Sequence, residues 1–161
     1  MLVFMYSAER ETKRKGVMER NVVHMDLDSF FVSVERLRNS KLMGKPVIIG
    51  GLSDRGVVAS CSYEARSFGV HSAMPMRMAR QLCGDAVVIR GDMDLYSRYS
   101  DIVTEIIEEN APLYEKASID EHYVDLTGME RFFGTLKWTR KLKGDIVKHT
   151  GLPVSFGLSL N

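Results

Sequence analysis

Residues 118–128, SIDEHYVDLTG, place two adjacent acids, Asp120 and Glu121, before a run in which apolar and polar residues alternate. A period of two is typical of a strand with one buried and one solvent-facing side. Residues 21–28, NVVHMDLD, have the same period. Their apolar face holds Val23, Met25 and Leu27, and their polar face holds His24, Asp26 and Asp28. If the two strands are neighbours in one sheet, Asp26, Asp120 and Glu121 converge at one edge.

Further strands are predicted from short apolar runs bounded by turn residues. They fall within residues 44–51, 56–62, 86–91, 113–118, 122–128 and 152–161. The fourth and fifth of these form an antiparallel hairpin, and the acids of the opening motif lie at its turn.

Helices are predicted where apolar residues recur at helical spacing. Ser29 can cap a helix that buries Phe30, Val34 and Leu37. A longer helix is expected over residues 92–110. Its buried stripe would be Leu95, Tyr99, Ile102 and Ile106, and that of a last helix Phe132, Leu136, Thr139, Leu142 and Ile146. Two short helices, within residues 63–70 and 74–84, each end at a glycine.

This order of elements predicts an α+β fold with a mainly antiparallel sheet and helices on one face. Residues 1–20 have no sustained period and are expected to form an amino-terminal extension. The main body would comprise residues 21–41 and 86–161, with residues 42–85 inserted as a small subdomain.

A protein that grips duplex nucleic acid by charge alone usually has an excess of basic residues. The charge of this chain does not indicate such a protein. The formal net charge is +1, and setting aside the five basic and three acidic residues of positions 1–20 leaves 17 basic and 18 acidic residues. Cys61 and Cys83 are far apart and lack zinc-ligand spacing, which favours a reducing compartment. No apolar run is long enough to cross a membrane, so a cytoplasmic protein without a membrane partner is expected.

Converging carboxylates repel one another unless cations neutralise them, and hard oxygen ligands suit Mg²⁺. Two such ions about 4 Å apart can activate a hydroxyl on one side and steady a leaving phosphate on the other. The spacing alone supports equally well a solvated hairpin tip with unrelated acids, because acids are common in turns.

Three motifs together resemble the Y-family translesion DNA polymerases, most closely the DNA polymerase IV branch. They are, in order, VVHMDLDSFFVSVE, GVVASCSYEARSFGVHSAMPM and SIDEHYVDLTG. The resemblance runs from about residue 21 to the end. It implies a polymerase palm (21–41 and 86–161) with inserted fingers (42–85), and an enzyme of DNA repair and damage tolerance that adds a dNTP to a primer 3′-hydroxyl with release of pyrophosphate. Its implied partners are dNTP and primer–template DNA, with a sliding clamp as a further candidate.

The resemblance also implies roles for individual residues. Asp26, the backbone carbonyl of Leu27, Asp120 and Glu121 match the groups that hold two Mg²⁺ ions, and Asp28 has a supporting role. Phe31 matches the aromatic residue that lies under the incoming sugar and excludes a ribose 2′-hydroxyl. Without the resemblance, a phenylalanine next to Phe30 would more often be part of the hydrophobic core. The residues that match contacts to the triphosphate are Ser60, Tyr63 and Arg66. Alone, a Tyr and an Arg three positions apart on a helix commonly only cover a surface.

Some features depart from the family pattern. His122 stands where the family usually has a small residue and could crowd the site. Neither His24 nor His122 has a metal-ligand partner in the sequence, so each is expected to be an ordinary sheet residue with satisfied hydrogen bonds. The family's next segment, after Asn161, contains a lysine for the triphosphate, and the thumb and little finger follow. We therefore expect a fragment whose own activity is doubtful. The alternatives are an inactive folded fragment that self-associates through an unpaired sheet edge, or a palm-type nucleotide cyclase, for which SIDEH lacks the Gly-rich signature.

Overall fold

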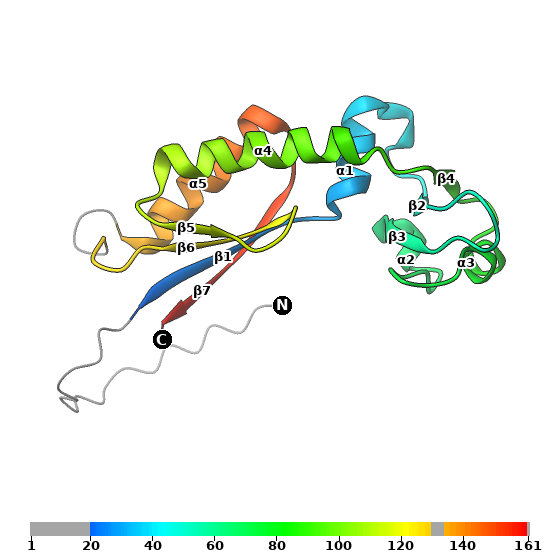
Figure 1. The fold of residues 1–161 in the computed structure, drawn as a ribbon, viewed down its shortest axis with the longest axis horizontal. Coiled ribbons are helices and arrows are strands. Elements are labelled where there is room, and N and C mark those ends of the chain that lie inside the picture. The colour runs from blue at the N-terminus through cyan, green and yellow to red at the C-terminus, as the bar shows by residue number, and fades with distance from the viewer. Residues whose placement is uncertain (1–19, 130–133, 161) are drawn as a thin grey trace.

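The computed structural model of the chain describes residues 20–129 and 134–160. Within them, two sheets lie toward opposite ends of the long axis, with helix α1 (Phe30–Arg38) between them (Figure 1). The predicted α+β class is confirmed. The expected extension, except for Arg20, and the helical position Phe132 lie outside the described residues.

The larger sheet has four antiparallel strands in the order β5-β6-β1-β7. They are β1 (Asn21–Leu27), β5 (Tyr114–Lys116), β6 (Glu121–Asp125) and β7 (Val154–Leu160). As the alternation predicts, β1 buries Val23, Met25 and Leu27. The register places Asp26 opposite Glu121 on β6 and Ser155 on β7. The two strands that carry the predicted acids are therefore neighbours.

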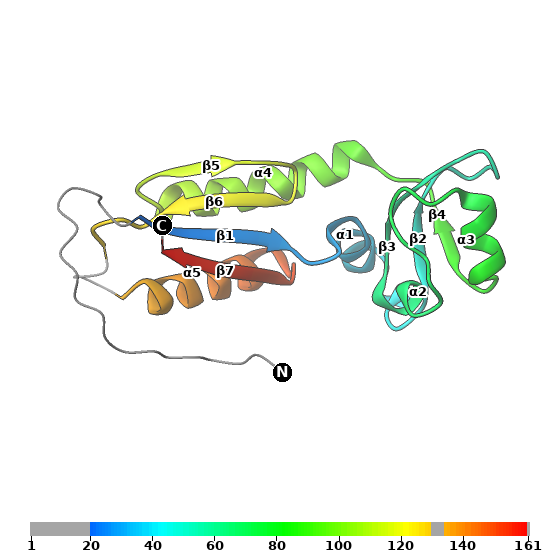
Figure 2. The ribbon, with the colours of Figure 1, turned by 90° about the horizontal axis from the view of Figure 1, so that it is seen from below.

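Helices α4 (Met93–Asn110) and α5 (Thr135–Thr150) cover one face of this sheet, and no helix of the described residues lies on the other face (Figures 1 and 2). The predicted stripe of α4 is displaced by one residue. The buried positions are Tyr96, Ser100, Val103 and Ile107. Ile102 is 43% exposed, while the other predicted positions are half-buried at the edge of the core. The apolar residues of α4 cover a wide band of the helix surface, so their helical spacing alone does not show which positions lie at the centre of the buried side. On α5, Thr139, Leu142 and Ile146 are buried as predicted, but Leu136 is exposed.

Helix α1 differs from the prediction at both ends. Ser29 has a left-handed backbone, with φ of 43°, and its side chain makes no capping hydrogen bond. The hydroxyl of Ser33 instead donates to the carbonyl oxygen of Asp28 at 2.8 Å. At the other end, Leu37 is 44% exposed, because the buried side of α1 is formed by Phe30, Val32, Val34 and Glu35.

The smaller sheet has the order β3-β2-β4. Its strands are β2 (Val47–Gly50), β3 (Val58–Cys61) and β4 (Val87–Ile89). Strand β3 is antiparallel to β2, whereas β4 is parallel to it. The segment around this sheet also contains η1 (Ser40–Leu42), α2 (Tyr63–Arg66) and α3 (Met76–Leu82). The structure thus places β4 in the small sheet, although the sequence assigns residues 86–161 to the main body.

The two sheets share one hydrophobic core. It contains the apolar face of β1, Phe30 and Val34 of α1, and Val47 and Ile49 of β2. Ile48, on the other side of β2, belongs to a second cluster with Cys61, Ala65 and Met76. Because α1 packs into the shared core, it fixes the small sheet relative to the large one. No helix of the described ranges has both the length and the apolar character needed to cross a membrane.

Candidate active site

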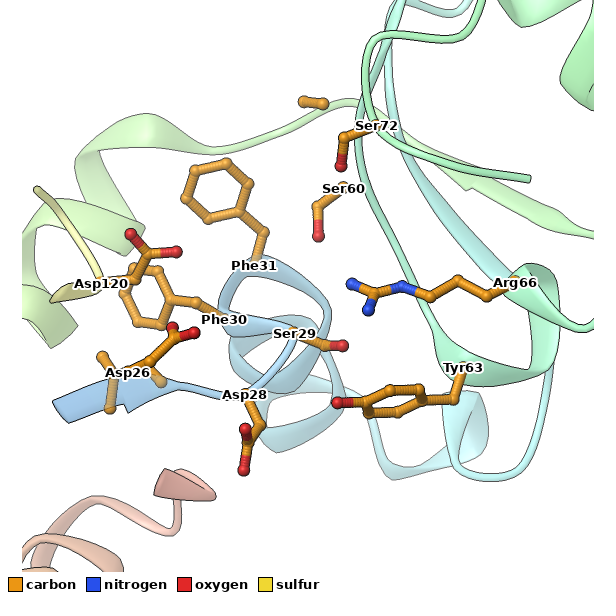
Figure 3. Close-up of a pocket in the computed structure, with 12 residues that line it drawn as sticks. Asp26, Asp28, Ser29, Phe30, Phe31, Ser60, Tyr63, Arg66, Ser72 and Asp120 are labelled. Carbon is orange, nitrogen blue, oxygen red and sulfur yellow. The ribbon is translucent and has the colours of Figure 1, made fainter. Parts of the chain in front are cut away.

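The predicted carboxylates meet at one end of β1 and β6. Asp26 and Glu121 are register partners, and the backbone N–H of Leu27 donates to the carbonyl oxygen of Asp120 at 3.0 Å. Figure 3 shows the carboxylates of Asp26 and Asp120 directed into the same space. Residues almost a hundred positions apart in the chain are thereby brought together, as the sequence predicts.

The electrostatics of this end of the sheet are those of a crowded acidic cluster. Partial burial raises the pKa of Asp26, and the neighbouring charges of Asp120, Glu121 and Asp28 raise it further, while His24 acts in the opposite direction. A cation placed between these carboxylates would relieve the repulsion. Asp28 contributes charge but turns toward β7, where its Oδ1 accepts a 2.7 Å hydrogen bond from Ser155 Oγ.

Ser118 holds the turn that presents the two adjacent acids. Its hydroxyl donates to Asp120 Oδ1 at 2.6 Å and accepts from the backbone N–H of Glu121 at 3.1 Å. Ser118 was not among the predicted site residues. The signal was its place two residues before Asp120, since a serine there commonly bonds the backbone of a turn.

The residues fit Mg²⁺ in donor chemistry, because the site offers carboxylate oxygens and a backbone carbonyl. As they stand, however, no three Asp, Glu, His or Cys side chains in the described part of the chain are grouped closely enough to hold a metal ion. Glu121 Oε1 lies 3.8 Å from His24 Nε2 and does not line the cavity described below. Side-chain rotation of Glu121 would be needed to complete a ligand set.

The two histidines of these strands differ. His122 is buried on the helix-facing side of β6, where its Nε2 lies 2.9 Å from Thr104 Oγ1 of α4. It is satisfied, as predicted, and the expected crowding of the site is wrong because its side chain lies on the opposite face of the sheet from Glu121. His24 stacks on Tyr123, with 4.7 Å between ring centroids. Its buried Nε2 has no hydrogen-bond partner among the described residues, so for His24 the predicted satisfaction is wrong.

A cavity of about 220 Å³ lies between this acidic end of the sheet and the small sheet. It is lined by Asp26, Leu27, Asp28, Ser29, Phe30, Phe31, Ala59, Ser60, Tyr63, Arg66, Ser72 and Asp120. All the predicted site residues except Glu121 are therefore brought around one space.

The wall opposite the acids is basic and aromatic. Figure 3 shows Arg66 and Tyr63, both from α2, across the cavity from Asp26 and Asp120. The guanidinium carbon of Arg66 lies 4.9 Å from the centroid of the Tyr63 ring, a cation–π distance. Ser62 caps α2, accepting from the N–H of Ala65 at 3.2 Å. A polyanion in this cavity would meet arginine on one side and, on the other, carboxylates that need a cation.

Phe31 lies on a stacked aromatic support. Its ring is 4.4 Å from that of Tyr96, with 14° between the planes. Tyr96 is 0% exposed, and its hydroxyl donates a 2.8 Å hydrogen bond to Glu35, which is 5% exposed. Burial, reinforced by Glu35, raises the pKa of Tyr96 well above its usual value. As predicted, Phe30 is buried while Phe31 reaches the cavity. Sequence reasoning did not identify Tyr96 or Glu35, which are far apart in the chain.

The chain is similar to known proteins in both sequence and fold. The family model described as "impB/mucB/samB family" matches residues 25–161. DNA polymerase IV of Treponema denticola is 50% identical over 144 residues, which are 89% of this chain and 36% of the relative. DNA polymerase IV of Clostridioides difficile is 42% identical, covering 88% of this chain and 40% of the relative.

Solved structures agree. The crystal structure of DinB from Sulfolobus solfataricus matches with a TM-score of 0.81 and 32% identity over 86% of this chain and 42% of that one. The insertion ternary complex of Dbh DNA polymerase matches with the same TM-score, identity and coverage. The chain thus spans about two fifths of the length of these relatives. The family model, the sequence identity and the shared fold agree. The chain belongs to the impB/mucB/samB family, which comprises the Y-family DNA polymerases, and it is of the DNA polymerase IV type.

Proposed function

We propose that this chain supplies the palm and fingers of a template-directed translesion DNA polymerase, which adds dNTP to a primer 3′-hydroxyl and releases pyrophosphate. The observation that carries the proposal is the cavity in which Asp26 and Asp120 face Arg66 and Tyr63. Acids that need a cation and an arginine fork that suits phosphate oxygens are complementary halves of a site for a nucleoside triphosphate with its metal ions.

The proposed roles follow the positions of the residues. Asp26, the carbonyl of Leu27, Asp120 and Glu121 would hold two Mg²⁺ ions. Bound there, the metal would lower the pKa of the primer hydroxyl and neutralise the triphosphate. Ser118 holds the Asp120 carboxylate in place. Catalysis by this chain would rest on orientation and electrostatic stabilisation, without a covalent enzyme intermediate.

The other wall would bind and select the nucleotide. Arg66 and Tyr63 would hold the β- and γ-phosphates with help from the Ser60 hydroxyl. Phe31 would lie beneath the sugar and reject a ribose 2′-hydroxyl, because its ring is backed by buried Tyr96 and cannot readily retreat.

The division of the chain follows from the same proposal. Residues 21–41 and 86–161 would form the palm and residues 42–85 the fingers, with β4 completing the fingers sheet through its pairing with β2. Primer–template DNA would be the macromolecular partner, and a sliding clamp is a further candidate. A polymerase that acts in DNA repair and damage tolerance needs access to chromosomal DNA, so we propose that the protein is cytoplasmic.

A second candidate is a folded, inactive chain that self-associates. Strand β7 is at the edge of the described sheet, and its Leu158 is exposed. An edge strand of this kind can pair with a second copy. The nucleotide-cyclase alternative gains no support, because the family assignment is to polymerases.

The test is primer extension by a chimera. Residues 20–161 replace the matching segment of Treponema denticola DNA polymerase IV, which is 50% identical to this chain over 144 residues. We expect Mg²⁺-dependent extension that Asp26→Asn abolishes. A folded chimera that does not extend a primer would contradict the proposed function, and sedimentation of the 161-residue chain would show whether it self-associates instead.

A further inference from the structure

We infer that the ion pair between Arg36 of α1 and Glu64 of α2 is a positioning device, which holds α2 so that Tyr63 and Arg66 face the cavity. The inference rests on the proposed function for its consequence, since these two residues are the proposed triphosphate contacts. Neither Arg36 nor Glu64 lines the cavity.

The contact is short and well supported on the Arg36 side. Arg36 Nη2 lies 2.8 Å from Glu64 Oε2. The same guanidinium donates to the carbonyl oxygens of Lys45 at 3.1 Å and Leu42 at 3.3 Å. With only 19% of its side chain exposed, Arg36 is fixed by three partners, so Glu64 binds to a rigid donor. Charge-assisted bonds of this kind are stronger than neutral ones.

Helix α2 needs such an anchor because it is a single turn of four residues. A turn of this length is not stable by itself. Burial of Ala65 and a pair of hydrogen bonds fix it to the small sheet: Ser62 Oγ accepts from the backbone N–H of Val47 at 2.9 Å, and the N–H of Ser62 donates to the carbonyl oxygen of Val47 at 2.9 Å. Glu64 adds the link to α1, the helix that carries Phe31 at its start.

The geometry of the turn connects this anchor to the cavity. At about 100° per residue, Glu64 and Arg66 project from nearly opposite sides of α2. Arg36 therefore holds the back of the turn while Arg66 points into the cavity (Figure 3). Burial opposes ionisation of Glu64, but hydrogen bonds, that from Arg36 the largest of them, together lower its pKa. The anchor is thus ionised at neutral pH. Loss of the Arg36–Glu64 ion pair would let Tyr63 and Arg66 move relative to Phe31, although every side chain that lines the cavity would still be present.

The first test needs no nucleotide. Hydrogen exchange is measured at the amides of Ala65, Arg66 and Ser67 in Glu64→Gln, Arg36→Met and the double variant. We expect exchange roughly tenfold faster in each single variant, with little further increase in the double variant because the two residues act through one contact. Lys116→Met is the matched control, because it breaks the pair Lys116–Asp101 far from α2. Unchanged exchange in Glu64→Gln, or additive effects of the two changes, would overturn the inference.

The second test measures affinity for a non-hydrolysable deoxynucleoside triphosphate with Mg²⁺, and for the corresponding monophosphate. Glu64→Gln should weaken triphosphate binding roughly three- to tenfold, with little effect on the monophosphate and on the melting temperature. Equal losses for both ligands would show a general structural role and overturn the positioning role. If neither the unchanged chain nor the chimera binds the triphosphate, the proposed function fails, whereas hydrogen exchange still decides whether the ion pair positions α2.

Discussion

Asp26 lies directly opposite Glu121 on the neighbouring antiparallel strand, at the end of the sheet where Asp120 also lies. Like charges placed opposite each other on a sheet destabilise it. The fold therefore carries an unfavourable arrangement at the position where the proposed chemistry needs negative charge.

Replacing Asp26 by asparagine should stabilise the free protein. The pKa of Asp26 is raised in the folded state, so the folded carboxyl holds its proton more tightly than the unfolded one, and ionisation at neutral pH costs stability. At pH 7 without divalent ions, we expect Asp26→Asn to increase the free energy of unfolding by roughly 0.5–1 kcal/mol after solvent screening. Denaturant titration measures it. The gain should disappear below the ordinary carboxyl pKa, and a gain that persists in acid would contradict the electrostatic cause.

Mild acid should destabilise the fold through His122. Burial lowers the pKa of His122 to about 4, so in the range from about pH 6.5 to 4 the unfolded chain binds a proton that the folded chain does not. Stability then falls as pH falls through this range, by up to about 3 kcal/mol. We expect the loss to be much smaller in His122→Gln, measured as the free energy of unfolding against pH. His149→Gln, on the exposed side of α5, is the control and should keep the wild-type profile.

Shortening Phe31 should open the site to ribonucleotides. In the chimera, Phe31→Ala removes the ring that is stacked on Tyr96, and with it the surface against which a 2′-hydroxyl would clash. We expect the ratio of kcat/KM for dNTP to that for the ribonucleotide to fall by at least about tenfold, or about 1.4 kcal/mol of discrimination. Unchanged discrimination would place the selecting group elsewhere.

Tyr96→Phe should show how much the buried hydrogen bond to Glu35 contributes to stability. The variant keeps the ring but leaves the buried carboxyl of Glu35 without the 2.8 Å hydrogen bond from the Tyr96 hydroxyl. An unpaired buried polar group costs about 1–3 kcal/mol, so the free energy of unfolding should fall by that amount. Tyr99→Phe, one turn away on α4 and only half-buried, is the matched control. Equal stabilities of the two variants would contradict the role given to the buried bond.

The parts of the fold that could be predicted are those encoded in local periodicity. Strand β1 alternates cleanly, and its acid Asp26 therefore had to share a face with other polar residues. The hairpin before Glu121 was equally clear, so the convergence of the acids followed once the strands were paired.

The remaining features depend on tertiary contacts that no local pattern specifies. The run Val87–Ile89 is apolar throughout, so its sequence did not show that it would pair in parallel with β2. The bond between Glu35 and Tyr96 joins residues 61 positions apart. Leu37 fits the apolar period of α1 but is exposed, because α1 is covered on a different side.

The central claim, that Asp26, Asp120 and Glu121 together hold divalent cations, is tested most directly by Mn²⁺ binding followed by electron paramagnetic resonance. It is measured with a non-hydrolysable deoxynucleoside triphosphate present, because the nucleotide supplies part of the ligand set. Asp125→Asn is the control. Asp125 lies on the same face of β6 as Glu121, but it is not one of the proposed metal ligands, and its carboxylate accepts a hydrogen bond from the Thr127 N–H. The account predicts saturable binding of two ions, retained in Asp125→Asn and weakened at least about tenfold in Asp26→Asn and Asp120→Asn. Equal Mn²⁺ binding by the unchanged chain and these two variants would contradict it.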